Sequence, residues 1–180
     1  MKFFKGSRNE SQLVRIRYVF FLAGAILGMA FGMSFQKLYA SDQNGDAVCL
    51  AKNIYFEAGN QPLAGKVAVA QVVMNRKEHS DYGNTVCDVV YQAKWYTNWK
   101  GNEMPVKNRC QFSWFCDGKS DEPLDTKTWF ASYKVASDVL MGKYPDITEG
   151  ATHYHADNIL PYWAESLNQT VHINNHIFYK

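Results

Sequence analysis

An uncharged run of 18 residues, Tyr18 to Phe35, divides the chain into two parts that fold by different rules. Five lysines and arginines against one glutamate precede this run within the first 17 residues. A basic flank followed by an apolar span of about 20 residues is typical of a signal peptide or of a signal anchor. Because the basic flank stays in the cytoplasm, both interpretations place the residues after Ala40 across the inner membrane.

We therefore divide the chain into a basic cytoplasmic N-terminus (1–17), a signal anchor or signal peptide (18–40), a polar linker (41–47) and one folded domain (48–180). Ala40 suits the position before a cleavage site, but Leu38 does not suit the position two residues earlier, which favours an uncleaved anchor. The folded domain is then periplasmic or membrane-anchored and faces the cell wall.

The net charge of +2 comes from the N-terminus, because the residues after position 17 carry a net charge of −2. Their lysines and arginines are scattered among acids rather than gathered in a patch. This pattern argues against nucleic acid as a partner.

The cysteines, Cys49, Cys87, Cys110 and Cys116, all follow the apolar run. An even number of cysteines in an exported domain predicts two disulfides, with three possible pairings. The spacing of these cysteines does not fit a structural zinc site.

Apolar spacing and capping residues predict four helices and a few short strands, which is an α+β fold with a helical half and a small strand-rich half. In the second helix, Val67, Ala70, Val73 and Met74 form an apolar stripe, and we expect Phe112, Trp129 and Phe130 in the core. The expected helices cover 48–58, 62–78, 85–91 and 126–141, the expected strands cover 111–115, 151–156 and 171–179, and residues 92–109 are expected to be irregular.

Glu57 is the only carboxylate between Asp46 and Glu78, and it lies where the first expected helix meets the turn before the second. Ile54, Tyr55 and Phe56 precede it. Apolar surroundings disfavour the charged form of a carboxylic acid and raise its pKa, so that the group can donate a proton near neutral pH. Glu57 is therefore a candidate general acid.

Four stretches carry a resemblance to a known family: LAKNIYFEAGNQPLAGKVAVAQVVMNR (50–76), TVCDVVYQ (85–92), CQFSWFCDG (110–118) and ATHYHADNILPYWA (151–164). In this order they resemble the cell wall hydrolase family of the spore-cortex-lytic (SleB/CwlJ) type, from about Cys49 to the C-terminus. The resemblance implies a single compact catalytic domain, similar to lysozyme and lytic transglycosylases, that acts on peptidoglycan without a cofactor or required metal.

The family signature reads Glu-Ala-Arg-Gly-Glu-Pro, and its first glutamate, taken as the catalytic acid, falls on Glu57. The chain departs from the signature at Gly59, Asn60 and Gln61, which replace the arginine, the glycine and the second glutamate. Glu57 is then the only acid of the motif.

The resemblance predicts cleavage of glycan strands between N-acetylmuramic acid and N-acetylglucosamine, with Glu57 as acid and then base. Hydrolysis requires a second carboxylate. Asp157 is the best remaining candidate for that role, ahead of Asp88 and Asp117, but none of the three has a claim comparable to that of Glu57. Attack by the sugar's own 6-hydroxyl requires no second carboxylate, so we expect a lytic transglycosylase. We expect the following residues to bind or orient the substrate: Thr152, His153, Tyr154, His155, Trp163, Trp95 and Gln111.

Two alternatives remain open. His153 and His155, or His172 and His176, lie two or four residues apart on expected strands, where each pair could hold a metal for a cell wall amidase or peptidase. In the favoured interpretation, His153 and His155 instead lie near Glu57, and His176 is a buried, hydrogen-bonded ring. The other alternative is a peptidoglycan-binding module without catalytic activity.

Overall fold

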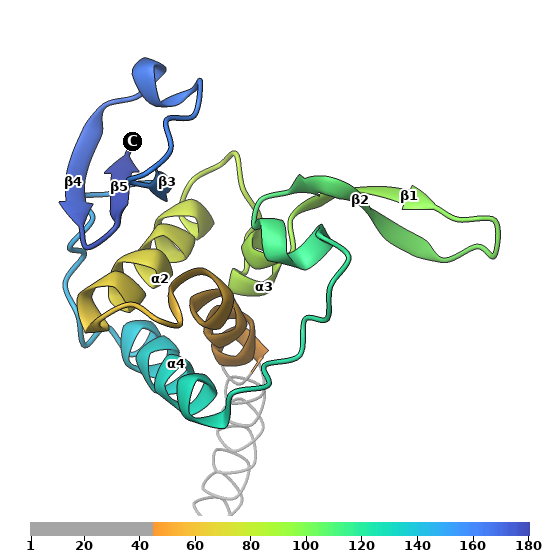
Figure 1. Ribbon diagram of the computed structural model, residues 1–180, viewed down its shortest axis with the longest axis horizontal. Helices are drawn as coiled ribbons and strands as arrows, with labels where there is room; N and C mark the ends of the chain where they lie inside the picture. Colours follow the sequence, from red (N-terminus) through yellow and green to blue (C-terminus); the bar gives the residue numbers. More distant parts are fainter. Residues whose placement is uncertain (1–44) are drawn as a thin grey trace, which may run out of the picture. The chain divides into compact units, whose positions relative to one another are not determined.

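The computed structural model describes residues 45–180, which belong to one compact unit, Asn44–Lys180 (Figure 1). The expected N-terminus (1–17), the expected anchor or signal peptide (18–40) and residues 41–44 of the expected linker lie outside the described residues. None of the helices within residues 45–180 is long and apolar enough to cross a bilayer.

The helical half contains the four expected helices. They are a helix whose described part covers residues 45–58, α2 (Leu63–Lys77), α3 (Val86–Val90) and α4 (Thr126–Leu140). Residues 45–47, expected in the linker, are already helical. Thr85 caps α3, accepting a hydrogen bond from the backbone of Asp88 while the Asp88 carboxylate accepts one from the backbone of Thr85. Local capping and apolar spacing explain why these helices could be predicted.

The core of this half lies between helix 45–58, α2, α3 and α4. Leu50, Ile54, Val73 and Val89 are fully buried in it. Two disulfides are present, Cys49–Cys87 and Cys110–Cys116, which confirms their expected number. The first joins helix 45–58 to α3, so that α3, although only five residues long, is tied to the helix that ends at Glu57.

The packing face of α4 differs from the expected one. Phe130, expected in the core, is 65% exposed, whereas Phe112 is buried and Trp129 packs against the core as expected. The buried residues of α4 are Ser132, Val135, Ala136, Asp138 and Val139. These side chains are shorter than the Phe130 ring, and they allow α4 to approach α2 closely.

The strand-rich half is an antiparallel sheet with the order β3-β5-β4: β3 (His153–Ala156), β4 (Gln169–Ile173) and β5 (His176–Tyr179). The single strand expected over 171–179 is wrong, because the chain turns at Asn174 (φ 54°) and forms a hairpin of β4 and β5. Asparagine tolerates this left-handed conformation. Phe178 of β5 packs with Ala68 and Val72 of α2, which fixes the sheet against the helical half.

Residues 92–109, expected to be irregular, form most of a second hairpin, β1 (Ala93–Thr97) paired with β2 (Glu103–Cys110) (Figure 1). Because none of its strand residues is buried, it lacks the alternation of apolar and polar residues that indicates a strand. Its turn contains Gly101 (φ 82°), and Asn98 Oδ1 accepts hydrogen bonds from the backbone of Lys100 and of Asn102.

The strand expected over 111–115 is also wrong, because Ser113–Cys116 form the 3-10 helix η1. The Cys110–Cys116 disulfide closes this short loop, and Trp114 is buried with its Nε1 donating to Asn53 Oδ1 at 3.1 Å. A covalent bridge over six positions prevents the chain from extending.

Candidate active site

Glu57 lies at the C-terminal end of helix 45–58, one residue before the fully buried Ala58. Its side chain is half-buried, and Tyr154 of β3 donates a hydrogen bond from its hydroxyl to Glu57 Oε2 at 3.0 Å. The two residues are 97 positions apart in the sequence. The site is therefore assembled where the helical half meets the three-stranded sheet.

Burial raises the pKa of Glu57 above its ordinary value. The hydrogen bond from Tyr154 and the positive charge of Arg76 each lower this pKa and so offset part of the effect. The direction agrees with the expectation from the apolar sequence around Glu57. A carboxyl group in this environment retains its proton at higher pH than an exposed glutamate does.

Arg76, near the C-terminal end of α2, is a residue of the site that the sequence analysis missed. It is only 5% exposed, and its Nε donates to the backbone oxygen of Thr152 at 2.7 Å. Its guanidinium lies 5.3 Å from the ring centroid of Tyr82 and 5.1 Å from that of Phe112. Nη1 is buried without a hydrogen-bond partner among residues 45–180. Its neighbours Asn75 and Lys77 are polar, so the helix pattern gave no signal that singled it out.

Arg76 brings a buried positive charge to the carboxyl of Glu57. Burial lowers the pKa of Arg76, while the hydroxyls of Tyr154 and Tyr82 and the carboxylate of Glu57 act in the opposite direction. Arg76 also donates to the backbone oxygen of Thr152, the residue before β3, so that the cation beside Glu57 is fixed to the start of the sheet.

Tyr154, not His153 or His155, is the β3 residue in contact with Glu57. Its ring lies 5.1 Å from His176 and 5.6 Å from Phe178, on the face of the sheet that meets α2. Burial raises the pKa of the Tyr154 hydroxyl well above its ordinary value, and the negative charge of Glu57 adds to the effect. The hydroxyl therefore stays protonated and acts as a hydrogen-bond donor.

His153 and His155 point to the other face of β3, because successive strand residues alternate. Their rings lie 5.4 and 5.6 Å from the Trp163 ring. The Nδ1 of His153 is 3.0 Å from the Oγ1 of Thr152, and burial together with Arg76 lowers the pKa of His153. His155 is held by Ala156 O at 2.9 Å and by the Tyr179 hydroxyl at 3.0 Å.

The histidines do not converge on a metal site. Both ring nitrogens of His155 have hydrogen-bond partners, and His172 Nε2 lies 3.7 Å from Asp157 Oδ2. His176 is buried as expected, but its Nδ1 lacks the expected hydrogen-bond partner within the described part of the chain. Across residues 45–180, no three His, Cys, Asp or Glu side chains are close enough together to hold a metal ion.

Trp95 and Gln111, two other expected substrate-binding residues, lie on the β1–β2 hairpin and just after it. Trp95 is 46% exposed and its ring lies 5.8 Å from that of Phe115. Gln111 is exposed, and its backbone N–H donates to Gln92 O at 2.9 Å. The hydrogen bond that the Glu57 carboxyl makes within residues 45–180 comes from Tyr154 and not from either of these side chains.

The other carboxylates weighed in the sequence are used elsewhere. Asp88 belongs to the cap of α3, Asp117 pairs with Lys119 at 3.3 Å, and Asp157 is the acid beside His172. None of them contacts Glu57.

Gly59, which replaces the arginine of the family signature, is required by the turn that follows Glu57. A Cβ atom at this position would lie 2.4 Å from the backbone oxygen of Tyr55 and 3.0 Å from Cγ2 of Thr128 in α4. The departure from the signature therefore accompanies a turn packed too tightly for a side chain.

Glu57 is thus a half-buried carboxyl with a raised pKa, placed between the helical half and the small sheet. The sequence model of the family described as Cell Wall Hydrolase matches residues 60–179, and the chain belongs to this family. The matched region begins three residues after Glu57. No curated protein matches the chain in sequence.

Two solved structures share the fold. The catalytic domain of the germination-specific lytic transglycosylase SleB from Bacillus anthracis is 26% identical, with a TM-score of 0.56, over 75% of this chain and 93% of that one. The catalytic domain of the Bacillus cereus SleB protein is 23% identical, with a TM-score of 0.52, over 76% of this chain and 91% of that one. These matches confirm the expected α+β fold and the resemblance to the SleB type.

Proposed function

We propose that the chain is a lytic transglycosylase that cuts peptidoglycan between N-acetylmuramic acid and N-acetylglucosamine, with Glu57 as its only acid and base. The observation that carries the proposal is the half-buried carboxyl of Glu57, whose pKa is raised; within residues 45–180 the groups that act on this pKa are Tyr154 and Arg76, and no second carboxylate is among them. The B. anthracis relative, a lytic transglycosylase, supports the same reaction.

In the first step, protonated Glu57 donates its proton to the glycosidic oxygen as the bond to C1 of muramic acid breaks. Tyr154 donates to Oε2, so that Oε1 is the oxygen left to carry the transferred proton. The N-acetylglucosamine product leaves with a hydroxyl formed from that oxygen and proton.

In the second step, the Glu57 carboxylate takes the proton from the muramic acid 6-hydroxyl while that oxygen bonds to C1. A 1,6-anhydro sugar forms and Glu57 is protonated again, so that the cycle consumes no water. Arg76 and Tyr154 both favour the ionised form of Glu57, which exists only between the two steps. They thereby limit the rise in the pKa of Glu57, so that the carboxyl can still give up its proton.

Residues along β3 and the following loop then hold a neighbouring part of the glycan strand, because His153 and Trp163 lie on the face of β3 opposite to Tyr154. Thr152, His153 and Trp163 form a connected group through the Thr152–His153 hydrogen bond and the contact between the His153 and Trp163 rings. The lowered pKa of His153 leaves it neutral near pH 7. It is therefore suited to hydrogen bonding with sugar hydroxyls rather than to pairing with charge.

Export fits this function. The basic N-terminus 1–17 and the segment 18–40, which begins with the uncharged run 18–35, would carry the domain across the inner membrane and hold it there, facing the cell wall. The two disulfides support an oxidising compartment, because disulfides are rare in the reducing cytosol.

The test is the chemistry of the products. Purified sacculi are digested with the chain in water enriched in heavy oxygen, and the released muropeptides are analysed by mass spectrometry. We expect 1,6-anhydromuramic ends without the heavy isotope, at an undiminished rate in the presence of a chelator. Reducing ends that contain heavy oxygen would make water the nucleophile and contradict the proposal.

A digest of the same sacculi with the Glu57→Gln chain is the matched control. If the unsubstituted chain released peptides while the glycan strands stayed intact, and if the chelator abolished that release, the amidase alternative would be supported. Binding of sacculi without any release would support the non-catalytic module.

A further inference from the structure

The β1–β2 hairpin is folded but contributes little to the core. It extends away from the helices and from the three-stranded sheet (Figure 1). A two-stranded hairpin is marginally stable on its own, and this one is held at its base by the Cys110–Cys116 disulfide and by the contact of Trp95 with Phe115. Anchoring of this kind, around strands that bury almost nothing, indicates a role outside the core.

Large apolar side chains are exposed along the hairpin. Trp99 at the turn is 89% exposed, and Tyr96 of β1 and Met104 of β2, which are register partners, are 50% and 41% exposed. Exposed apolar groups concentrated on one element mark a binding surface. Flat rings suit the apolar faces of sugar rings.

The hairpin also concentrates positive charge, in contrast to the scattered distribution of lysines and arginines expected from the sequence. Residues 45–180 carry 13 lysines and arginines against 15 aspartates and glutamates, and residues 93–110 hold four of these cations and one of these acids. The hairpin therefore has a net charge of +3, whereas the rest of the described chain has −5. All four cations, Lys94, Lys100, Lys107 and Arg109, are exposed. This separation favours a partner that carries negative charge.

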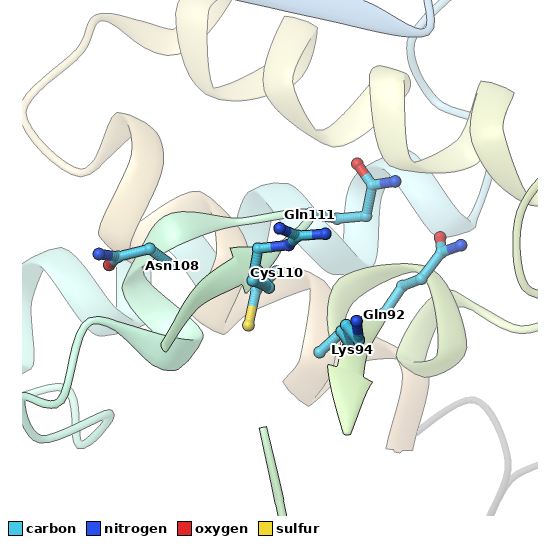
Figure 2. A pocket seen from close by; sticks show the side chains of 7 residues that line it. Gln92, Lys94, Asn108, Cys110 and Gln111 are labelled. Carbon is cyan, nitrogen blue, oxygen red and sulfur yellow. The ribbon is translucent and has the colours of Figure 1, made fainter. Parts of the chain in front are cut away.

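A pocket of about 420 Å³ lies where the hairpin joins the domain (Figure 2). Lys94 and Arg109 line it together with the polar side chains of Gln92, Asn108 and Gln111. Figure 2 shows the Gln92 and Gln111 side chains pointing to the same side of the pocket. Two cations beside amide groups suit a ligand with a carboxylate next to peptide bonds.

We propose that the β1–β2 hairpin is a second binding surface for peptidoglycan, in addition to the site at Glu57. The rings of Tyr96 and Trp99 stack on the glycan, and Lys94 and Arg109 bind carboxylates of its peptide side chains. This inference rests on the proposed function for its substrate.

The composition of the turn argues against a membrane surface as the partner. Trp99 is the one apolar residue among Asn98, Lys100, Gly101 and Asn102, whereas an inserting tip requires a continuous apolar face. The amide-lined pocket is also suited to a peptide rather than to a lipid headgroup.

The experiment measures binding without digestion. The full-length chain with Glu57→Gln is sedimented with purified sacculi, and the dissociation constant is compared for three variants of it. Lys94→Ala with Arg109→Ala removes the pocket cations, and Trp99→Ala removes the turn ring. The control, Lys127→Ala with Phe130→Ala, removes an exposed cation and an exposed ring from α4.

We expect each hairpin variant to bind sacculi on the order of tenfold more weakly, and the α4 control to bind unchanged. On sacculi stripped of their peptides by an amidase, Lys94→Ala with Arg109→Ala should have no effect, while Trp99→Ala should still weaken binding. Because all these side chains are exposed, thermal unfolding of the variants should match that of the parent.

Unchanged binding by both hairpin variants would overturn the inference. So would hairpin variants that keep their affinity for sacculi and lose affinity for vesicles of anionic phospholipid, since the surface would then serve a membrane. Lysis of sacculi by the unsubstituted chain tests the proposed function separately. Absent lysis together with weakened binding by the hairpin variants would reject the proposed function and leave the binding surface standing.

Discussion

Replacing Glu57 by glutamine should make the domain more stable and less active at the same time. The amide has nearly the same shape and still accepts the hydrogen bond from Tyr154, but it carries no charge. It therefore removes the desolvation that raises the pKa of Glu57. Partial burial of one carboxylate with one hydrogen-bond donor costs about 1 kcal/mol near neutral pH, which corresponds to roughly 4 °C in the melting temperature of a domain of this size.

The pH dependence of this stability difference follows from the direction of the shift. Below the ordinary pKa of 4.5, Glu57 is protonated in both the folded and the unfolded chain, and the two proteins should be equally stable. Above that value the unfolded chain ionises first, so that the folded wild type loses stability relative to Glu57→Gln until the pH passes the raised pKa. Denaturant unfolding at a series of pH values measures this difference.

The activity of Glu57→Gln should fall, although its stability rises. General acid catalysis contributes about 100-fold to 10,000-fold, or ~2.7 to ~5.4 kcal/mol of transition-state stabilisation. Lysis of sacculi by Glu57→Gln should therefore be lost, whereas Glu165→Gln, at an exposed position, should change neither property. Retention of more than about a tenth of wild-type activity would remove Glu57 as the acid. A variant less stable than wild type at pH 7 would refute the argument from burial.

Two further perturbations test the site and its support. Tyr154→Phe removes one of the two groups that lower the pKa of the Glu57 carboxyl, so the alkaline limb of the pH–rate profile should move to higher pH. The variant should also lose about 1 to 3 kcal/mol in stability. An unmoved limb would show that the hydrogen bond does not act on the catalytic group. Thiol counting on denatured protein should find no free cysteine. Loop closure predicts that losing the Cys49–Cys87 bridge, which spans 38 positions, costs about 4 kcal/mol, against about 2 kcal/mol for Cys110–Cys116, which spans 6. Equal losses in the two double alanine variants would contradict that difference.

Local chemistry was sufficient to predict the helices from the sequence. Thr85 and Asp125 cap α3 and α4 through their own side chains, and Pro62 precedes α2. These signals act within one helical turn, so no distant residue is needed to interpret them. The candidate acid could also be predicted locally, since Glu57 is the only carboxylate between Asp46 and Glu78 and follows apolar residues in the chain.

The strands were decided by contacts that the sequence does not display. The β1–β2 hairpin lacks a buried face, so periodicity carries no signal for it. The segment after it coils into a 3-10 helix because Cys110 bonds to Cys116, a pairing that the cysteine count left open.

The partners of Glu57 likewise depend on tertiary structure. Tyr154 reaches the carboxyl from a strand 97 positions away, and the alternation along β3 selects it over His153 and His155. Arg76 becomes part of the site only because α2 packs against both the helix of Glu57 and the sheet. The sequence by itself determined which acid is present and that its neighbours disfavour its charge. Only the tertiary structure decided which donor and which cation balance that charge, because both come from elements brought together by the core.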